Sequence, residues 1–238
     1  MEKETDISKK TNNSTAKKAL GRLCLITLIV ALCLFGTAGT VSWLNGWIFM
    51  IAYVLVLITL TGLVFRSSPE LVKERMEASH KAKSWDRAIV PVLAIILPLL
   101  SVILAGLDHR FGWTDDLGTP AIFTALAVMT AGSALTTWAM RVNRFFSSHV
   151  RIQADRGHYV VTGGPYQWIR HPGYTGSIMF NLASPVLLGS FPALGAGIVF
   201  VMVMAVRTAL EDKTLKNELP GYDEYAVKTR WRLLPFIW

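Results

Sequence analysis

Two stretches of the chain carry side chains suited to chemistry. In the first, residues 163–174, two glycines and a proline predict a turn, and Arg170 and His171 supply polar groups ahead of Pro172. Pro172 favours a helix start, because the first N–H groups of a helix need no partner within it. These N–H groups and the positive end of the helix dipole would point back into the turn. Such an arrangement suits an anionic ligand group.

An alternative interpretation of this stretch is an interfacial loop between two membrane helices. Tyr166, Trp168 and Tyr174 would then be aromatic residues at the membrane surface. From the stretch alone, both interpretations remain open.

The second stretch is Arg207, Glu211 and Asp212, at the end of the last apolar region. Arg207 and Glu211 are four residues apart and therefore share one helix face. An ionisable pair within or beside a membrane helix is costly, which suggests a functional site. The alternative is an arginine that extends to the membrane surface and pairs with the glutamate at the helix end.

The composition is that of a membrane protein. Of the 238 residues, 52% are hydrophobic and 17% charged, whereas about a quarter are charged in a typical soluble domain. The net charge of +8 comes from basic residues that separate apolar runs, a pattern that favours lipid headgroups over nucleic acid. Cys24 and Cys33 lie within one apolar run and on no common helix face, so neither a disulfide nor a metal site is expected.

The apolar runs predict an all-α, polytopic membrane protein with about six crossings. Four spans are expected at residues 20–39, 47–65, 89–107 and 120–140, followed by a helical hairpin over 175–209 that is broken near 189–192. Small residues at Gly132, Ser133 and Ala134 would allow close helix packing. The polar connection at 66–87 predicts a short surface helix over 69–76.

The composition also divides the chain into three parts. Residues 1–18 predict a disordered cytosolic tail, residues 19–140 form the N-terminal membrane spans, and residues 141–238 hold both chemical stretches. A cytosolic segment of short helices is expected from residue 210 onward. Of the 24 lysines and arginines, all but Arg110 fall on one side of this topology. The positive-inside rule then predicts cytosolic N and C termini, with the candidate site at the cytosolic face.

Several short motifs follow one another in the last part of the chain. They are His158-Tyr159-Val160-Val161, Gly164-Pro165-Tyr166, Arg170-His171-Pro172-Gly173-Tyr174, Arg207 with Glu211-Asp212 and Leu215, Tyr222 with Tyr225, and the closing residues 232–237. In this order and spacing, roughly residues 141–238 resemble the isoprenylcysteine carboxyl methyltransferase family, in a broader group with the phospholipid N-methyltransferases. The first two spans and the 66–87 connection take no part in the resemblance.

The resemblance implies an integral membrane methyltransferase that uses S-adenosyl-L-methionine without a Rossmann domain. The chain indeed has no Gly-x-Gly-x-x-Gly motif after a predicted strand. By resemblance, Arg207 is catalytic and faces the methyl acceptor, and the cofactor-binding residues are Gln153, His158, Tyr159, Val160, Val161, Tyr166, His171, Pro172, Gly173, Tyr174 and Glu211. No metal is expected, because His80, His109 and His149 have no partners at metal-ligand spacing.

The chemistry of the acceptor stays open. A carboxylate is already ionised at neutral pH and needs no general base, and Arg207 would orient it bidentately. An amine must first lose a proton, for which Glu211, Asp212 or His171 would serve. We expect a lipophilic or lipid-linked acceptor with a carboxylate as the favoured group, and no nucleic acid or obligate protein partner. The alternatives are N-methylation of a phospholipid or small amine, an NADPH-dependent membrane reductase, and a transporter.

Overall fold

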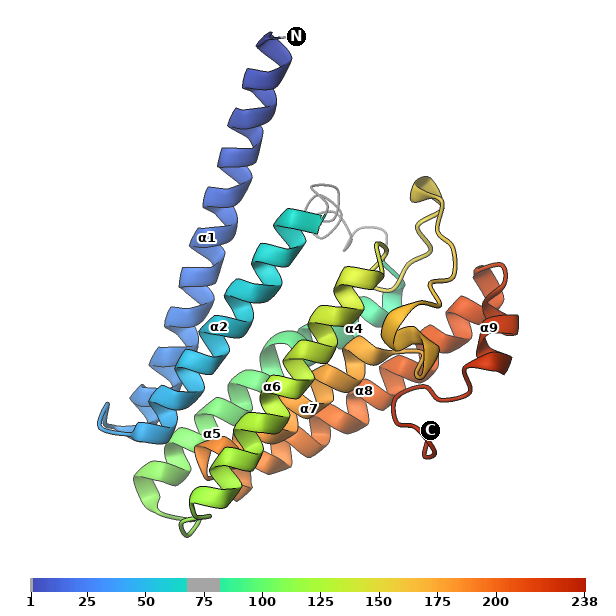
Figure 1. Ribbon diagram of the computed structural model, residues 1–238. Coiled ribbons are helices and arrows are strands. Elements are labelled where there is room, and N and C mark those ends of the chain that lie inside the picture. The colour runs from blue at the N-terminus through green and yellow to red at the C-terminus, as the bar shows by residue number, and fades with distance from the viewer. Residues whose placement is uncertain (1, 68–81) are drawn as a thin grey trace.

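The computed structural model describes residues 2–67 and 82–238, and every regular element in these two ranges is a helix (Figure 1). The predicted all-α class is confirmed. The α-helices are α1 (Glu2–Ala38), α2 (Leu44–Ser67), α4 (Ser84–Pro91), α5 (Leu97–Phe111), α6 (Thr119–Val142), α7 (Pro172–Leu188), α8 (Phe191–Glu218) and α9 (Tyr222–Lys228). The π-helix η1 (Val92–Ile96) joins α4 to α5, and the 3-10 turns η2 (Ala154–Arg156) and η3 (Gly164–Gln167) interrupt the polar insert after α6.

The protein is a polytopic membrane protein. Five stretches of the described chain are long and apolar enough to cross a bilayer: Ala19–Ala38, Leu44–Leu63, Ser84–Phe111, Thr119–Val142 and Phe191–Glu218. The sixth expected crossing, α7, has 17 residues and is not among these five. It lies at the short end of the range for a membrane helix.

The third span contains two prolines. Pro91 and Pro98 donate no backbone hydrogen bond, and the span adapts with the π-helical residues 92–96 between them. The helix also begins earlier than the apolar run predicts, at Ser84. Asp86 is therefore part of the span and is completely buried.

For the polar segments, the sequence predicts a tail, a surface helix and a helix end. Helix α1 runs back through residues 2–18, for which the composition predicts a disordered cytosolic tail. The last span continues to Glu218 rather than ending near residue 209, and it stops before Pro220, which disfavours helix in the preceding residue. The surface helix predicted at 69–76 lies outside the described residues.

Helices α6 and α7 pack backbone against backbone, as the small residues predict. A Cβ on Gly132 would lie 2.6 Å from the carbonyl oxygen of Gly176, and a Cβ on Gly176 would lie 2.3 Å from that of Gly132. Both distances are too short for a real side chain. This contact fixes α7 beside α6 and so fixes the position of the α7 N-terminus, where the first chemical stretch ends.

The chemical stretches meet at one end of the bundle. The insert between α6 and α7, the N-terminal end of α7, the C-terminal end of α8 and helix α9 gather there, together with the start of α4 (Figure 1). Helix α8 has 28 residues, a length of roughly 42 Å at the usual rise, which exceeds the roughly 30 Å apolar core of a bilayer. The helix is therefore longer than a crossing perpendicular to the bilayer requires.

The α6–α7 contact makes a stability prediction. We expect Gly176→Ala to lower the free energy of unfolding by about 1–3 kcal/mol, because the added methyl group forces the two backbones apart. Thermal unfolding of the purified protein in detergent measures this. The matched control is Gly195→Ala in α8, where nothing lies within 4 Å of the added carbon. Equal unfolding temperatures for the two variants would contradict the close contact.

Candidate active site

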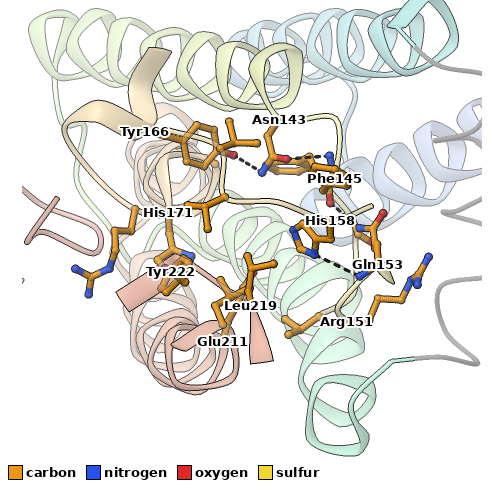
Figure 2. A pocket seen from close by; sticks show the side chains of 18 of the residues that line it. Asn143, Phe145, Arg151, Gln153, His158, Tyr166, His171, Glu211, Leu219 and Tyr222 are labelled. Atoms are coloured by element: carbon orange, nitrogen blue, oxygen red, sulfur yellow. Dashed lines mark hydrogen bonds between the residues drawn. The ribbon is translucent and has the colours of Figure 1, made fainter. Parts of the chain in front are cut away.

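One cavity at this end of the bundle gathers most of the predicted site. Its empty volume is about 790 Å³, part of it open to solvent, and the insert, the start of α7, the end of α8 and the start of α9 line it (Figure 2). Ten of the eleven residues predicted to bind the cofactor line this cavity: Gln153, His158, Tyr159, Val160, Val161, Tyr166, His171, Gly173, Tyr174 and Glu211. Pro172 does not line it and lies buried at the start of α7.

Gln153 and His158 shape one wall of the cavity. The Gln153 side chain donates to the carbonyl of Phe145 at 2.8 Å and accepts from Arg156 at 2.6 Å. Its backbone N–H donates to Nδ1 of His158 at 3.3 Å, which requires that nitrogen to be unprotonated. Burial, together with the nearby Arg151 and Arg156, lowers the pKa of His158 from 6.5 to about 4. The imidazole is therefore neutral at physiological pH.

Tyr166 forms the opposite wall with its ring buried. Its hydroxyl accepts a hydrogen bond from the Asn143 amide at 3.2 Å (Figure 2), and its backbone carbonyl accepts one from the Tyr225 hydroxyl at 2.7 Å. Burial raises the pKa of Tyr166 above its ordinary value, so the residue stays a neutral phenol. It offers an aromatic face and a dipole, not a charge.

Glu211 supplies the negative charge of the cavity. Among the described lining residues it is the only carboxylate, and it accepts a hydrogen bond from the Tyr174 hydroxyl. The Tyr174 ring in turn stacks on His171, with ring centroids 5.6 Å apart and planes 6° apart. Tyr174 and His171 come from the start of α7 and Glu211 from α8, so the contact joins the two chemical stretches.

Asp212 follows Glu211 in the sequence, and both of its carboxylate oxygens accept hydrogen bonds from neighbouring side chains. Its Oδ1 accepts from Arg170 Nε at 2.7 Å, from the Tyr222 hydroxyl at 2.9 Å, and lies 3.4 Å from His171 Nε2. Its Oδ2 accepts from Arg170 Nη2 at 3.0 Å and from Arg232 Nε at 3.0 Å. These contacts leave Asp212 unsuited to the proton-accepting role considered for it with an amine acceptor.

Arg170, which binds Asp212, also donates hydrogen bonds to the C-terminal segment. Its Nη1 donates to the carbonyls of Thr229 and Arg230, each at 2.8 Å. The backbone N–H groups of Arg170 and His171 donate to the carbonyls of Trp231 and Arg232, each at 2.9 Å. The end of the chain is thereby held against the turn that precedes α7.

Arg207 lies beside the cavity and is not among its lining residues. Its guanidinium donates to Asp86 Oδ1 at 2.8 Å and to the carbonyl of Ser148 at 2.9 Å, and its central carbon lies 5.0 Å from the centre of the Tyr174 ring. Sequence reasoning missed Asp86, because the 66–87 connection takes no part in the resemblance. The sequence does place Asp86 just before an apolar run. An ionisable residue in a membrane helix suggests a function, so this position could have been selected.

Fold and site together define a polytopic helical membrane protein with an aromatic and charged cavity at one end of its bundle. Residues 124–217 match the model of the isoprenylcysteine carboxyl methyltransferase (ICMT) family, which confirms the resemblance inferred from the motifs. The matched range runs from α6 through the insert and α7 into α8, and so contains most of the cavity wall.

Curated relatives agree with this match. The protein-S-isoprenylcysteine O-methyltransferase of Schizosaccharomyces pombe is 29% identical over 124 residues, which cover 45% of this chain and 52% of that protein. The B enzyme of the same name from Arabidopsis thaliana is 28% identical over 145 residues, 58% of this chain and 66% of that protein. The Bacillus subtilis protein YpbQ, itself uncharacterised, is 23% identical over 167 residues, 69% of this chain and 89% of that protein. The chain thus spans about half to two thirds of the yeast and plant relatives.

The Asp212 network makes a prediction on stability. Replacing Asp212 with alanine leaves the buried Arg170 without its carboxylate, which is expected to cost about 3–5 kcal/mol. We expect a lower unfolding temperature and faster protease cleavage after residue 218, because the C-terminal segment loses its anchor. The control is Asp223→Ala, an exposed acid in α9. Cleavage as slow as in the wild type would contradict the anchoring role.

His158 makes a prediction on pH. Its pKa is about 4 in the folded protein and near 6.5 in an unfolded chain, so the unfolded state binds the proton more readily between these values. The stability that neutral His158 contributes is complete above pH 6.5 and is lost as the pH falls toward 4. We expect the unfolding temperature of His158→Gln to fall less steeply over this range than that of the wild type. Parallel curves would contradict the lowered pKa.

Proposed function

We propose that this protein is a membrane-bound methyltransferase that transfers a methyl group from S-adenosyl-L-methionine to the carboxylate of a lipophilic acceptor. The observation that carries the proposal is the single cavity in which ten of the residues predicted from the motifs come together. The family match over residues 124–217 and the names of the yeast and plant relatives support it.

The cavity suits the chemistry of the cofactor. S-adenosyl-L-methionine would supply an electrophilic methyl group on a cationic sulfonium, attached to an adenosine and an amino acid end. Tyr166, Val160 and Leu219 offer aromatic and apolar surface for the adenine, and Glu211 offers a carboxylate for the ribose hydroxyls or the amino group. The N-terminus of α7, where Gly173 lines the cavity, suits the carboxylate of the cofactor.

The surroundings of the acids favour a carboxylate acceptor over an amine. An amine needs a base to take its proton, and both oxygens of Asp212 are already occupied by Arg170, Arg232 and Tyr222. Glu211 already accepts a hydrogen bond from the Tyr174 hydroxyl. A carboxylate needs no base, and alignment of its oxygen with the methyl group would supply much of the rate. N-methylation of a phospholipid or small amine is the second candidate.

The position of the cavity suits an amphipathic acceptor. It lies where α8 reaches the edge of the membrane, so a polar head group would meet it while the apolar tail stays between helices. This end also carries the insert and the C-terminal segment, which hold most of the basic residues of the second half of the chain. We place it on the cytosolic side by the positive-inside rule, with both termini cytosolic. Arg207 would orient the acceptor.

Methylation of defined acceptors tests the proposal. Purified protein is incubated with radiolabelled S-adenosyl-L-methionine and either N-acetyl-S-farnesylcysteine or phosphatidylethanolamine in vesicles. We expect label in the farnesylcysteine that base releases, because an ester is labile to base. Stable label in the phospholipid would favour N-methylation instead. Calorimetry that detects NADPH binding but no binding of S-adenosylhomocysteine would contradict both and favour a reductase.

Glu211 gives the sharpest test of the cofactor site. We expect Glu211→Gln to weaken S-adenosylhomocysteine binding by about ten- to a hundredfold, since hydrogen bonds to a charged group are among the stronger ones. Calorimetry on detergent-solubilised protein measures the affinity. Glu224→Gln, an exposed acid on α9, is the control and should bind as the wild type does. Equal affinities for the two variants would remove Glu211 from the site.

A further inference from the structure

Asp86 is a buried acid that lies outside the region of the family match. It stands in the first turn of α4, has no exposed surface, and precedes residues 124–217 in the chain. Its Oδ1 accepts from Arg207 Nε at 2.8 Å. Its Oδ2 accepts from the backbone N–H of Val150 at 2.8 Å and lies 3.5 Å from Arg207 Nη2. One carboxylate therefore joins α4, the insert and α8.

The contacts around Asp86 hold the Arg207 guanidinium in one orientation. Asp86 accepts hydrogen bonds from Nε and Nη2, and the carbonyl of Ser148 accepts a second hydrogen bond from Nη2 at 2.9 Å. The guanidinium carbon lies over the Tyr174 ring, whose hydroxyl binds Glu211. Within residues 2–67 and 82–238, Nη1 makes no hydrogen bond. It is the part of the guanidinium left for a ligand.

We infer that Asp86 is a positioning residue for the methyl acceptor, which it orients through Arg207. By engaging Nε and Nη2, Asp86 leaves Nη1 as the group that binds the acceptor carboxylate. The acceptor is then held by Nη1 alone, in place of the bidentate contact that the sequence predicts for Arg207. The inference rests on the proposed function and adds α4, a helix outside the family match, to the residues that set the reaction geometry.

Asp86 also contacts the cavity wall through Val150. An effect of Asp86 on this wall has to be distinguished from its effect on Arg207. The backbone N–H of Lys83 donates to the carbonyl of Val150 at 3.1 Å, and the backbone N–H of Val150 donates to the Asp86 side chain, so two hydrogen bonds join the start of α4 to the insert. Val150 lines the cavity. If Asp86 acted only through this wall, its loss would weaken cofactor binding as much as it slows the reaction.

Two variants test the inference against N-acetyl-S-farnesylcysteine as the acceptor probe. Asp86→Asn keeps an oxygen for the Val150 N–H but removes the charge that orients Arg207. We expect its kcat to fall about a hundredfold through misplacement of the acceptor, with S-adenosylhomocysteine affinity within about threefold of the wild type. Arg207→Lys keeps a cation beside Asp86 but has no Nη1. We expect it to bind the probe at least about tenfold more weakly than the wild type.

The double variant shows whether Asp86 acts through Arg207. In the Arg207→Lys background, Asp86→Asn should change kcat by less than about threefold, because the group that it orients is already gone. The matched control is Asp108→Asn, a buried acid at the opposite end of the bundle that accepts from Thr114 at 2.8 and 2.7 Å. It should lower the unfolding temperature without changing kcat.

The outcomes separate this inference from the proposed function. Binding of the probe by the wild type without methyl transfer contradicts the proposed function. An unchanged kcat in Asp86→Asn, an equal loss of cofactor affinity, or multiplicative effects in the double variant overturn the role of Asp86. If Asp86→Asn does not fold, Arg207→Lys decides, and probe affinity equal to that of the wild type overturns the inference. Absence of probe binding by the wild type overturns it as well.

Discussion

Buried charge that must be paired is the constraint on which the active end of this protein depends. Asp212 is nearly inaccessible, and a lone carboxylate there would carry a large desolvation penalty. Arg170 and Arg232 neutralise it and Tyr222 adds a hydrogen bond, and these three partners come from the turn before α7, the C-terminal segment and α9. Satisfying one acid thus requires three segments to meet, and two of the residues in this network, Arg170 and Tyr222, also line the cavity.

The bundle supplies the rigid base for this assembly. Glycines at the α6–α7 contact let the two backbones touch, which fixes where α7 begins. His171 immediately precedes α7 and Gly173 and Tyr174 lie in its first turn, so their positions follow from the packing contact at Gly176, two to five residues further along the chain. A soluble methyltransferase of the Rossmann type would place such groups at the ends of strands, whereas here helix ends and a polar insert do so.

Two neighbouring acids of α8, Glu211 and Asp212, have different surroundings. Glu211 and Asp212 are adjacent in sequence and point in directions about 100° apart on the helix. Asp212 is directed into the network of arginines, and Glu211 lines the cavity beside Tyr174. Arg207 lies one turn before Glu211 and is bound to Asp86 of α4. A single helix thereby connects the cavity, the anchor of the C-terminal segment and the first turn of the third span.

The sequence by itself determined the membrane class, most helix positions and ten of the residues that line the cavity. Apolar run length sets the spans, proline and glycine set the helix ends near residues 172 and 189, and the order of short motifs selects the lining residues. Only the tertiary structure decided the partners. Asp86 and Arg207 are 121 residues apart and Arg170 and Asp212 are 42 apart, so no local pattern relates them. The partner of a buried charge is whichever opposite charge the packed helices bring within reach, and packing is a property of the whole bundle.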